Sequence, residues 1–390
     1  FMPKIQKCKF IASAGLDNFG DGLMTIFFPL IMLSMTSDPI IFSLSYVIKT
    51  FSSVLSSFLS GYILDFHPIL KVTKLAKIAR LISLILIISL PMNITMILFC
   101  ALIFGATEVF IDNSTQTISL SLYQKKELVS INNKLQSMEY FFVFFIGPIA
   151  GAFIFKPYNN TLLYFAITTY SLSLLLFSFM NDIPSNNRKH KENAFNEIMH
   201  GLKFLLSHVS LRILCIYAAA FCLVISCLFS IFPMIISSQV NDPQLFTGLF
   251  YALNSLGFVL ASSLTPIFSR VISTRKLLFI SLCFAFLSSI ILVLDHTIYI
   301  MLISVFFLGC GMGCWGCIAV TYRQKVIPQG IFSRTNAVYR LFSWGALCVG
   351  GLMGGAIYQI IGYDSLFYMT LAFTLFLTIS FYFMPLKDEL

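Results

Sequence analysis

Residues 211–238 read LRILCIYAAAFCLVISCLFSIFPMIISS, an apolar run in which Arg212 is the one charged side chain. A helix needs about 20 consecutive apolar residues to cross the hydrocarbon core of a bilayer. This run is longer than that requirement, so it predicts a transmembrane helix. Runs of the same kind recur along most of the chain.

The whole chain has the composition of a membrane protein. Hydrophobic residues make up 58% of its 390 positions and charged residues 11%, and its mean hydropathy is +0.89. A soluble domain carries about 25% charged residues. We therefore expect an all-α membrane protein with twelve transmembrane helices. Turn residues separate the expected spans, which lie near 10–34, 40–64, 73–91, 94–121, 134–155, 161–180, 211–238, 245–269, 276–294, 298–322, 336–361 and 364–384.

The lysines and arginines indicate the topology. If the N-terminus lies in the cytoplasm, all but two of the 25 fall on the cytoplasmic side, the exceptions being Lys156, outside, and Lys49, within the second span. The positive-inside rule then places both termini in the cytoplasm. It also accounts for the net charge of +9 without a nucleic-acid partner. We expect a multi-pass protein of the bacterial inner (cytoplasmic) membrane.

The two halves of the chain match each other. A shift of 203 residues places Asn133 on Asn336 and Gly147 on Gly350 without a gap. Parallel six-helix repeats with the binding site between them are a transporter architecture. We expect three parts: an N-terminal six-helix bundle over 1–180, a cytoplasmic linker with an amphipathic helix over 181–210, and a C-terminal six-helix bundle over 211–390.

Several charged side chains fall inside the expected spans of the first half. Asp17 and Asp21 lie four residues apart on the first span, and Glu108, Asp112 and Gln116 form one polar stripe on the fourth. A charge at the centre of a membrane helix costs about 2.5–3.5 kcal/mol on insertion scales. Residues retained at that cost are candidates for function.

Two interpretations of these charges are open. In the first, carboxylates carry protons, because desolvation favours the neutral form of a carboxyl group; the candidates are Asp21, Glu108, Asp112 and Asp17. In the second, Lys49 pairs with Asp21 or Glu108, and a static charge network holds the first, second and fourth spans together. Under the first, Glu108→Gln and Asp21→Asn should fold but lose proton-driven transport.

Other polar side chains are candidates for substrate contacts. Lys49 lies about ten residues into the second span, roughly 15 Å deep at 1.5 Å per residue. Arg340 lies near the start of the eleventh span, and no carboxylate falls inside a span of the second half. We expect the substrate to contact Lys49, Arg340, Gln116, Glu139, Asn254 and Trp344.

Small residues in the fifth span predict close helix packing and a kink. Gly147 and Gly151 have the spacing that lets membrane helices approach closely. Pro148 between them removes a backbone donor, which favours a kink. We expect these three residues to belong to a gate of the transport pathway.

The sequence offers no catalytic or metal-binding constellation. The five histidines are scattered, and no serine–histidine–acid order stands out. Cys314 and Cys317 match C-x-x-C but lie among glycines in one apolar run, which favours helix packing over a redox or metal role. We expect neither an enzyme nor a bound cofactor or metal.

Four segments resemble one branch of a known superfamily. They are DNFGDGL at 17–23, the set Gly105, Glu108, Asp112, Gln116 with NKLQ at 133–136 and Glu139, GLKFLL at 201–206, and RTNAVYRLFSWG at 334–345. Together they resemble the bacterial drug and siderophore exporters of the major facilitator superfamily, which include the macrolide efflux proteins and the enterobactin exporter. The resemblance covers essentially the whole chain.

The resemblance implies export and a cytoplasmic gate. The gate motif of the superfamily is gly-x-x-x-asp followed by basic residues; Gly61 and Asp65 match it. Phe66, His67 and Pro68 replace the early basic positions, so the motif is weakened. In the antiporter motif of the fifth span, an alanine replaces a second glycine.

The leading hypothesis is a proton-coupled secondary transporter that exports a small organic molecule by alternating access. Lys49 and Arg340 would suit an anionic cargo such as a carboxylate siderophore. A multidrug or macrolide-type efflux pump and a lysolipid transporter of the same fold are the alternatives. We expect the partners to be the substrate, protons and the lipid bilayer, and the protein to be a monomer.

Overall fold

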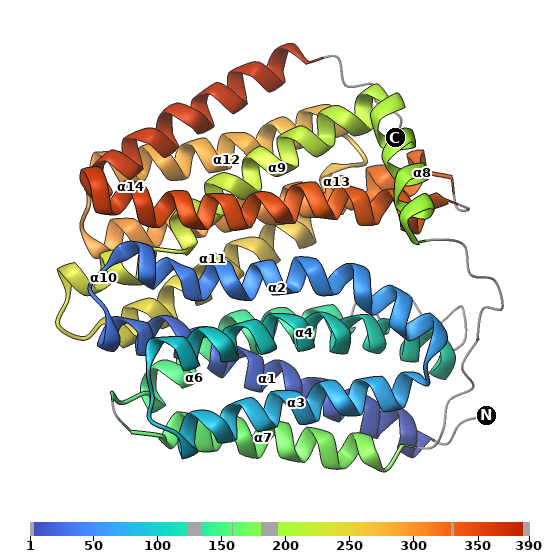
Figure 1. Cartoon of the computed structure of the whole chain (residues 1–390). Coiled ribbons are helices and arrows are strands. Elements are labelled where there is room, and N and C mark those ends of the chain that lie inside the picture. Colours follow the sequence, from blue (N-terminus) through green and yellow to red (C-terminus); the bar gives the residue numbers. More distant parts are fainter. Residues whose placement is uncertain are drawn as a thin grey trace. The chain divides into compact units, whose positions relative to one another are not determined.

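The computed structural model describes residues 4–123, 131, 134–157, 159–180, 194–328 and 331–384. Within them the chain is helical, and the one bridge of β type joins Lys156 to Asn159 (Figure 1). The helices are α1 (Lys4–Met35), α2 (Pro39–Phe66), α3 (Ile69–Ser89), α4 (Ile94–Leu122), η1 (Tyr140–Ile146), α6 (Gly147–Ile154), α7 (Thr161–Ser178), α8 (Ala194–Ser207), α9 (Val209–Phe229), α10 (Phe232–Gln239), α11 (Pro243–Phe268), α12 (Thr274–Leu294), α13 (Ile298–Val326) and α14 (Phe332–Phe383).

These elements account for twelve spans. Ten stretches of the described residues are long and apolar enough to cross a membrane. The helix α3 has 21 residues but carries four basic side chains, so it does not count among the ten. The helix α14 has 52 residues and contains two spans joined at Gly362. The prediction of an all-α fold with twelve transmembrane helices is confirmed.

The ends of the helices follow the turn residues in the sequence. Asp38 accepts hydrogen bonds from the backbone of Ile40 and Ile41 at 2.9 and 3.0 Å, which caps α2. Asn93 accepts one from the backbone of Met96 at 2.9 Å and caps α4. Each cap satisfies backbone donors that the first turn of a helix leaves unpaired.

Gly362 is the residue at which α14 departs from helical geometry. Its φ of 83° lies in the left-handed region, which other residues adopt only with strain. No atom beyond its chain neighbours lies within 4 Å of where its side chain would begin. Backbone conformation, and not lack of space, therefore favours glycine at this turn between the eleventh and twelfth spans.

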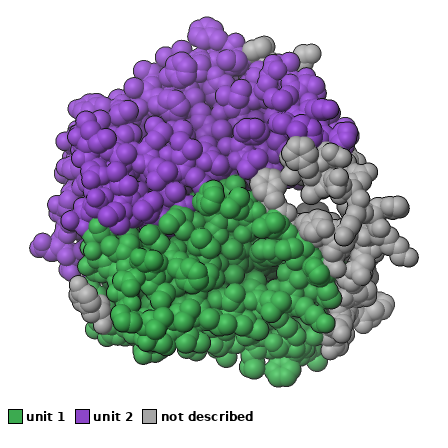
Figure 2. All heavy atoms as spheres, viewed as in Figure 1, with its two compact units in different colours: residues 1–36, 48–191 green, residues 37–47, 192–390 purple. Residues whose placement is uncertain are grey.

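Contacts divide the chain into two compact units. Unit 1 comprises residues 1–36 and 48–191, and unit 2 comprises residues 37–47 and 192–390 (Figure 2). In unit 1, α1 packs against α6, α7 and η1, and α3 packs against α4. In unit 2, α13 packs against α11 and α12, and α9 packs against α14.

The helix α8 lies within the linker that the sequence predicts over 181–210. It belongs to unit 2, where it packs against α9 and α14. Leu205 is buried, whereas Lys203 and Leu206 are exposed. One face of this helix thus packs onto the bundle and the other is accessible. The division into two six-helix bundles with this linker stays a prediction.

The ten cysteines are all free thiols. Nine are buried or half-buried, and Cys8 on α1 is the exposed one. Cys314 is buried in α13, and its thiol lies 3.4 Å from the backbone oxygen of Leu277 on α12. No group of three or more histidine, cysteine or acidic side chains in the described residues is arranged to hold a metal ion.

Candidate functional site

Unit 1 contains a buried ion pair between Asp17 on α1 and Lys77 on α3. Both side chains are 3% exposed. The Lys77 ammonium also donates to the hydroxyls of Ser13 at 3.0 Å and Ser173 at 2.7 Å, and it lies over the ring of Phe177. Three helices, α1, α3 and α7, therefore meet at one ammonium group.

A second buried pair lies one turn further along the same helices. Arg80 Nη1 donates to Asp21 Oδ1 at 2.5 Å, and the Tyr170 hydroxyl donates to the same oxygen at 2.6 Å. Arg80 Nε donates to Thr107 on α4 at 3.2 Å. The guanidinium stacks on the rings of Phe104 and Tyr170. The pair links α1, α3, α4 and α7. We call the two pairs Asp17–Lys77 and Asp21–Arg80 the charge ladder.

The cationic half of the charge ladder was missed in the sequence. The positive-inside rule assigns Lys77 and Arg80 to the cytoplasmic side, but both lie within α3, and their side chains are 3% and 0% exposed. A signal was present: the basic residues are three apart on one helix, and Asp17 and Asp21 are four apart on another. Such spacings place each set on one helix face, where the two sets can pair.

A third ion pair joins α2 to α4 and is accessible. Lys49 Nζ lies 3.0 Å from Glu108 Oε2, and the two side chains are 28% and 27% exposed. The sequence hypothesis of a Lys49 pair with Asp21 or Glu108 is thus met by Glu108, because Asp21 pairs with Arg80. The charge of Lys49, a predicted substrate contact, is therefore balanced by Glu108 inside the protein.

Further carboxylates lie near this pair. Asp112 and Gln116 follow Glu108 at intervals of one turn on α4 and are both exposed. Glu139, half-buried, immediately precedes η1 and interacts electrostatically with Glu108 and Asp112. Neither Asp112 nor Glu139 has a cationic ion-pair partner among the residues that the structure describes. Unit 1 therefore brings together Lys49, Glu108, Asp112 and Glu139.

Three of the predicted substrate contacts, Arg340, Trp344 and Asn254, belong to unit 2. The Arg340 guanidinium stacks on the ring of Trp344 at 4.0 Å, one turn along α14. Asn254 is buried and donates to the backbone oxygen of Val305 at 3.2 Å, which holds α11 against α13. Arg340 and Trp344 are half-buried, and Asn254 is tied to a neighbouring helix.

The predicted gate residues of the fifth span form a tight helix contact. Gly147 lies against Gly22 on α1, and a β-carbon at either would overlap the backbone oxygen of Phe142. The Gly147 N–H donates to that same oxygen, five residues back, as in a π-helix. Pro148 follows directly, and Gly151 packs on Ile26 of α1. The surroundings of Gly61 and Asp65, near the end of α2, lie outside what the structure describes.

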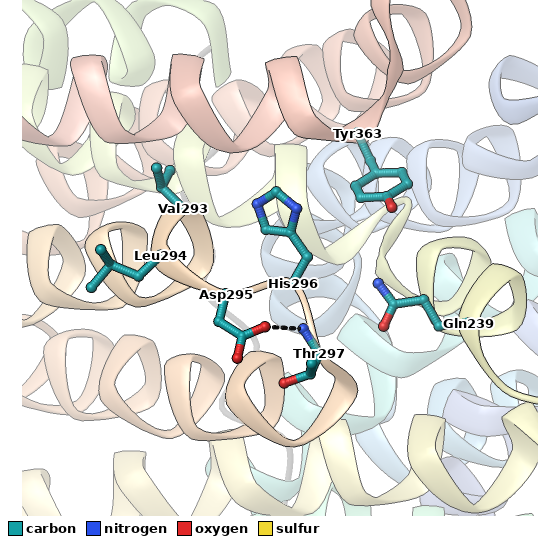
Figure 3. A pocket seen from close by; sticks show the side chains of 7 residues that line it. All are labelled: Gln239, Val293, Leu294, Asp295, His296, Thr297 and Tyr363. Carbon is teal, nitrogen blue, oxygen red and sulfur yellow. Dashed lines mark hydrogen bonds between the residues drawn. The ribbon is translucent and has the colours of Figure 1, made fainter.

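A separate hollow of about 460 Å³ lies in unit 2, near the ends of α10 and α12 (Figure 3). His296 Nδ1 lies 3.0 Å from Asp364 Oδ1, which joins the loop between α12 and α13 to the turn within α14. The hollow contains none of the residues predicted for the site. It is lined by Gln239, Val293, Leu294, Asp295, His296, Thr297 and Tyr363.

Solved structures share the fold over nearly the whole chain. The nucleoside transporter NupG matches with a TM-score of 0.81 at 13% identity, covering 98% of each chain. A bacterial homologue of the iron transporter ferroportin in an inward-facing state matches at 0.70, with 14% identity and 98% of each chain covered. A bacterial homologue of the human lysosomal transporter Spinster matches at 0.71, with 13% identity, covering 98% of this chain and 97% of the other. At such low identity these likenesses show the fold alone.

A sequence comparison also assigns a family. Comparison with curated proteins finds no match. The profile of a family described as transmembrane secretion effector matches residues 4–389. The twelve spans and the solved structures agree with that match. The chain therefore belongs to the transmembrane secretion effector family and is a multi-pass membrane transporter of the major facilitator fold.

Proposed function

We propose that the protein is a secondary transporter that exports a small organic molecule in exchange for protons by alternating access. The observation that carries this proposal is Asp112, an exposed carboxylate on a transmembrane helix with no ion-pair partner among the described residues. A charge facing lipid is costly, so accessible carboxylates within spans face water-filled space. Such a group can take up and release protons.

The accessibility of the carboxylates decides which of them we assign to coupling. Asp17 is held in a buried ion pair by Lys77, and Asp21 is held by Arg80 and by the hydroxyl of Tyr170. Glu108 and Asp112 are accessible, and each proton that enters through them gains about 2.3 kcal/mol per 100 mV of membrane potential. We assign proton exchange to Glu108 and Asp112, and helix packing to the charge ladder.

The experiment is a mass-spectrometric comparison of culture medium and cell extract. Source cells with and without this gene are grown in iron-poor and iron-rich medium. The deletion strain is complemented with the wild-type gene, with Asp112→Asn, or with Asp242→Asn. Asp242 is an exposed aspartate at the start of α11 and serves as the matched control.

We expect a compound that leaves wild-type and Asp242→Asn cells but accumulates inside the deletion and Asp112→Asn cells. Identical media from all strains would contradict export. Normal export by Asp112→Asn would contradict its proton role. A metal-chelating compound missing only from the iron-poor medium of the deletion strain would identify the cargo as a siderophore.

A further inference from the structure

The ion pair between Lys49 and Glu108 is fixed on a rigid helix crossing. A β-carbon on Gly105 would overlap the backbone oxygen of Lys49, so α2 and α4 touch at this point. The Ser53 hydroxyl lies 3.0 Å from the backbone oxygens of both Lys49 and Gly105. Because the two backbones are held together, the carboxylate and the ammonium meet at a set place.

This pair is open to water, unlike the charge ladder. Its side chains are more than a quarter exposed. The exposed apolar residues Phe51 and Leu55 of α2 lie on another face, because they are about 200° and about 240° around the helix from Lys49 at 100° per residue. The apolar face of α2 is suited to contact lipid, whereas the ion pair lies on a different face of the helix. A solute in water can therefore reach Glu108.

The charges around the pair favour a cation. Lys49 pairs with Glu108, and the nearby Arg80 pairs with Asp21. The carboxyl groups of Asp112 and Glu139 add to the group without a cationic ion-pair partner among the described residues. When these carboxyl groups are ionised, they repel an approaching anion at short range. An approaching cation is attracted. The Lys49 ammonium itself shows which chemical group the Glu108 carboxylate holds at hydrogen-bond distance.

The charge of the cargo also sets the direction of coupling. An anion would displace Glu108 from Lys49, and the released carboxylate would then tend to take up a proton. Anion and proton would travel together, so proton entry would drive uptake. A cation instead competes with the proton for Glu108: when the cation leaves, a proton from water replaces it. This competition drives export by proton entry.

We propose that the exported substrate carries an ammonium or a similar compact organic cation, which binds the Glu108 carboxylate in place of Lys49 Nζ. The proposal rests on the export function proposed above. It replaces the anionic cargo that the sequence suggests with a basic one. Lys49 thereby acts as an internal substitute that occupies Glu108 when neither substrate nor proton does.

A binding experiment tests the Glu108 carboxylate directly. Purified Lys49→Ala, Lys156→Ala and Lys49→Ala/Glu108→Gln are heated with n-butylammonium chloride or sodium butyrate at equal ionic strength. Lys156 is an exposed lysine of unit 1 and provides the matched control. We expect butylammonium to raise the Tm of Lys49→Ala alone, because binding to the folded state stabilises it. Equal shifts in Lys49→Ala and Lys156→Ala, or a larger shift with butyrate, would overturn the proposal.

Ion exchange then identifies the charge of the natural cargo. Media from cells with and without the gene are passed over cation-exchange and anion-exchange resins before mass spectrometry. We expect the gene-dependent compound in the cation-exchange fraction. A gene-dependent compound found only in the anion-exchange fraction would overturn the cationic substrate but leave export intact. No gene-dependent compound in either fraction would instead overturn the export function on which the proposal rests.

Discussion

The two units hold their helices together by different chemistry. In unit 1, buried charges link α1, α3, α4 and α7 through the charge ladder. In unit 2, α11 and α13 meet through Gly309 and Gly313, which lie against the backbone of Asn254 and Phe258. Ser230 Oγ likewise donates to the backbone oxygen of Gly351 at 3.0 Å. Both units contain close glycine contacts, and unit 1 adds the buried ion pairs of the charge ladder.

The difference shows that two halves with matching sequences can be stabilised by different buried contacts. The repeat between the halves preserves glycines such as Gly147 and Gly350, which lie at helix contacts in both units. It does not preserve Asp17, Asp21, Lys77 or Arg80. A buried ion pair holds its geometry only while both partners are present, whereas a glycine contact depends on shape. The two units should therefore fail under different substitutions.

The largest effect is expected from Arg80→Gln. It leaves the carboxylate of Asp21 buried without its cation, which typically costs about 3–5 kcal/mol. Thermal unfolding of the purified protein measures the loss. Lys156→Gln, an exposed lysine, serves as the control and should unfold like the wild type.

The double variant Asp21→Asn/Arg80→Gln sharpens this test. Removing both charges leaves no unpaired ion, so much of the lost stability should return. A double variant less stable than Arg80→Gln would contradict an ion pair as the source of the effect.

A smaller effect is expected from Gly309→Ala in unit 2. The added methyl overlaps the backbone of Asn254, and overpacking typically costs about 1–3 kcal/mol. Gly345→Ala is the matched control on α14, because no neighbouring atom lies within 4 Å of the added methyl. Chemical or thermal unfolding of both variants should show a loss only for Gly309→Ala. Equal stability of the two would mean that the α11–α13 contact is not tight.

Asp364→Asn should have a still smaller effect. Asp364 pairs with His296 at 3.0 Å, but its side chain is 59% exposed. Exposed ion pairs contribute at most about 1 kcal/mol. The same Asp-to-Asn change at Asp21 should cost more, and comparing the two unfolding curves isolates the effect of burial. A greater loss at Asp364 would reverse the comparison.

The smallest effect on stability is expected from Asp112→Asn. Substitution of an exposed side chain usually changes stability by about 0.5 kcal/mol or less. Export should nevertheless be lost, because the amide cannot carry a proton. Unfolding and export are measured on the same variant. A variant that loses stability and export together would point to a structural role for Asp112.

Most of the fold could be predicted from the sequence. Apolar runs of sufficient length predict the spans, since the bilayer requires about 20 apolar residues whatever their order. The boundary between the last two spans was placed at the turn Gly362–Asp364, where the positive φ occurs. The helix α3 was also assigned despite its basic residues. These features depend on local composition, which a sequence displays directly.

The candidate site was predicted only in part. Glu108, Asp112 and Lys49 were selected because charges in membrane helices are costly, and the structure places them together. Which carboxylates are buried depends on tertiary partners, so the pairing of Asp17 and Asp21 with α3 was not foreseen. The positive-inside pattern already accounts for the charges of Lys77 and Arg80, so it gives no reason to expect buried ion pairs. The seven-residue π-helix η1 had no sequence prediction beyond the proline that follows it.

The single exposed thiol has a practical consequence for determining sidedness. Cys8 lies near the N-terminus, and the other nine cysteines are buried or half-buried. A membrane-impermeant maleimide should therefore label Cys8 first, without prior removal of the rest. Labelling in inverted membrane vesicles but not in intact cells would place this end in the cytoplasm. Labelling in intact cells would invert the topology, and with it the side from which each helix end is reached.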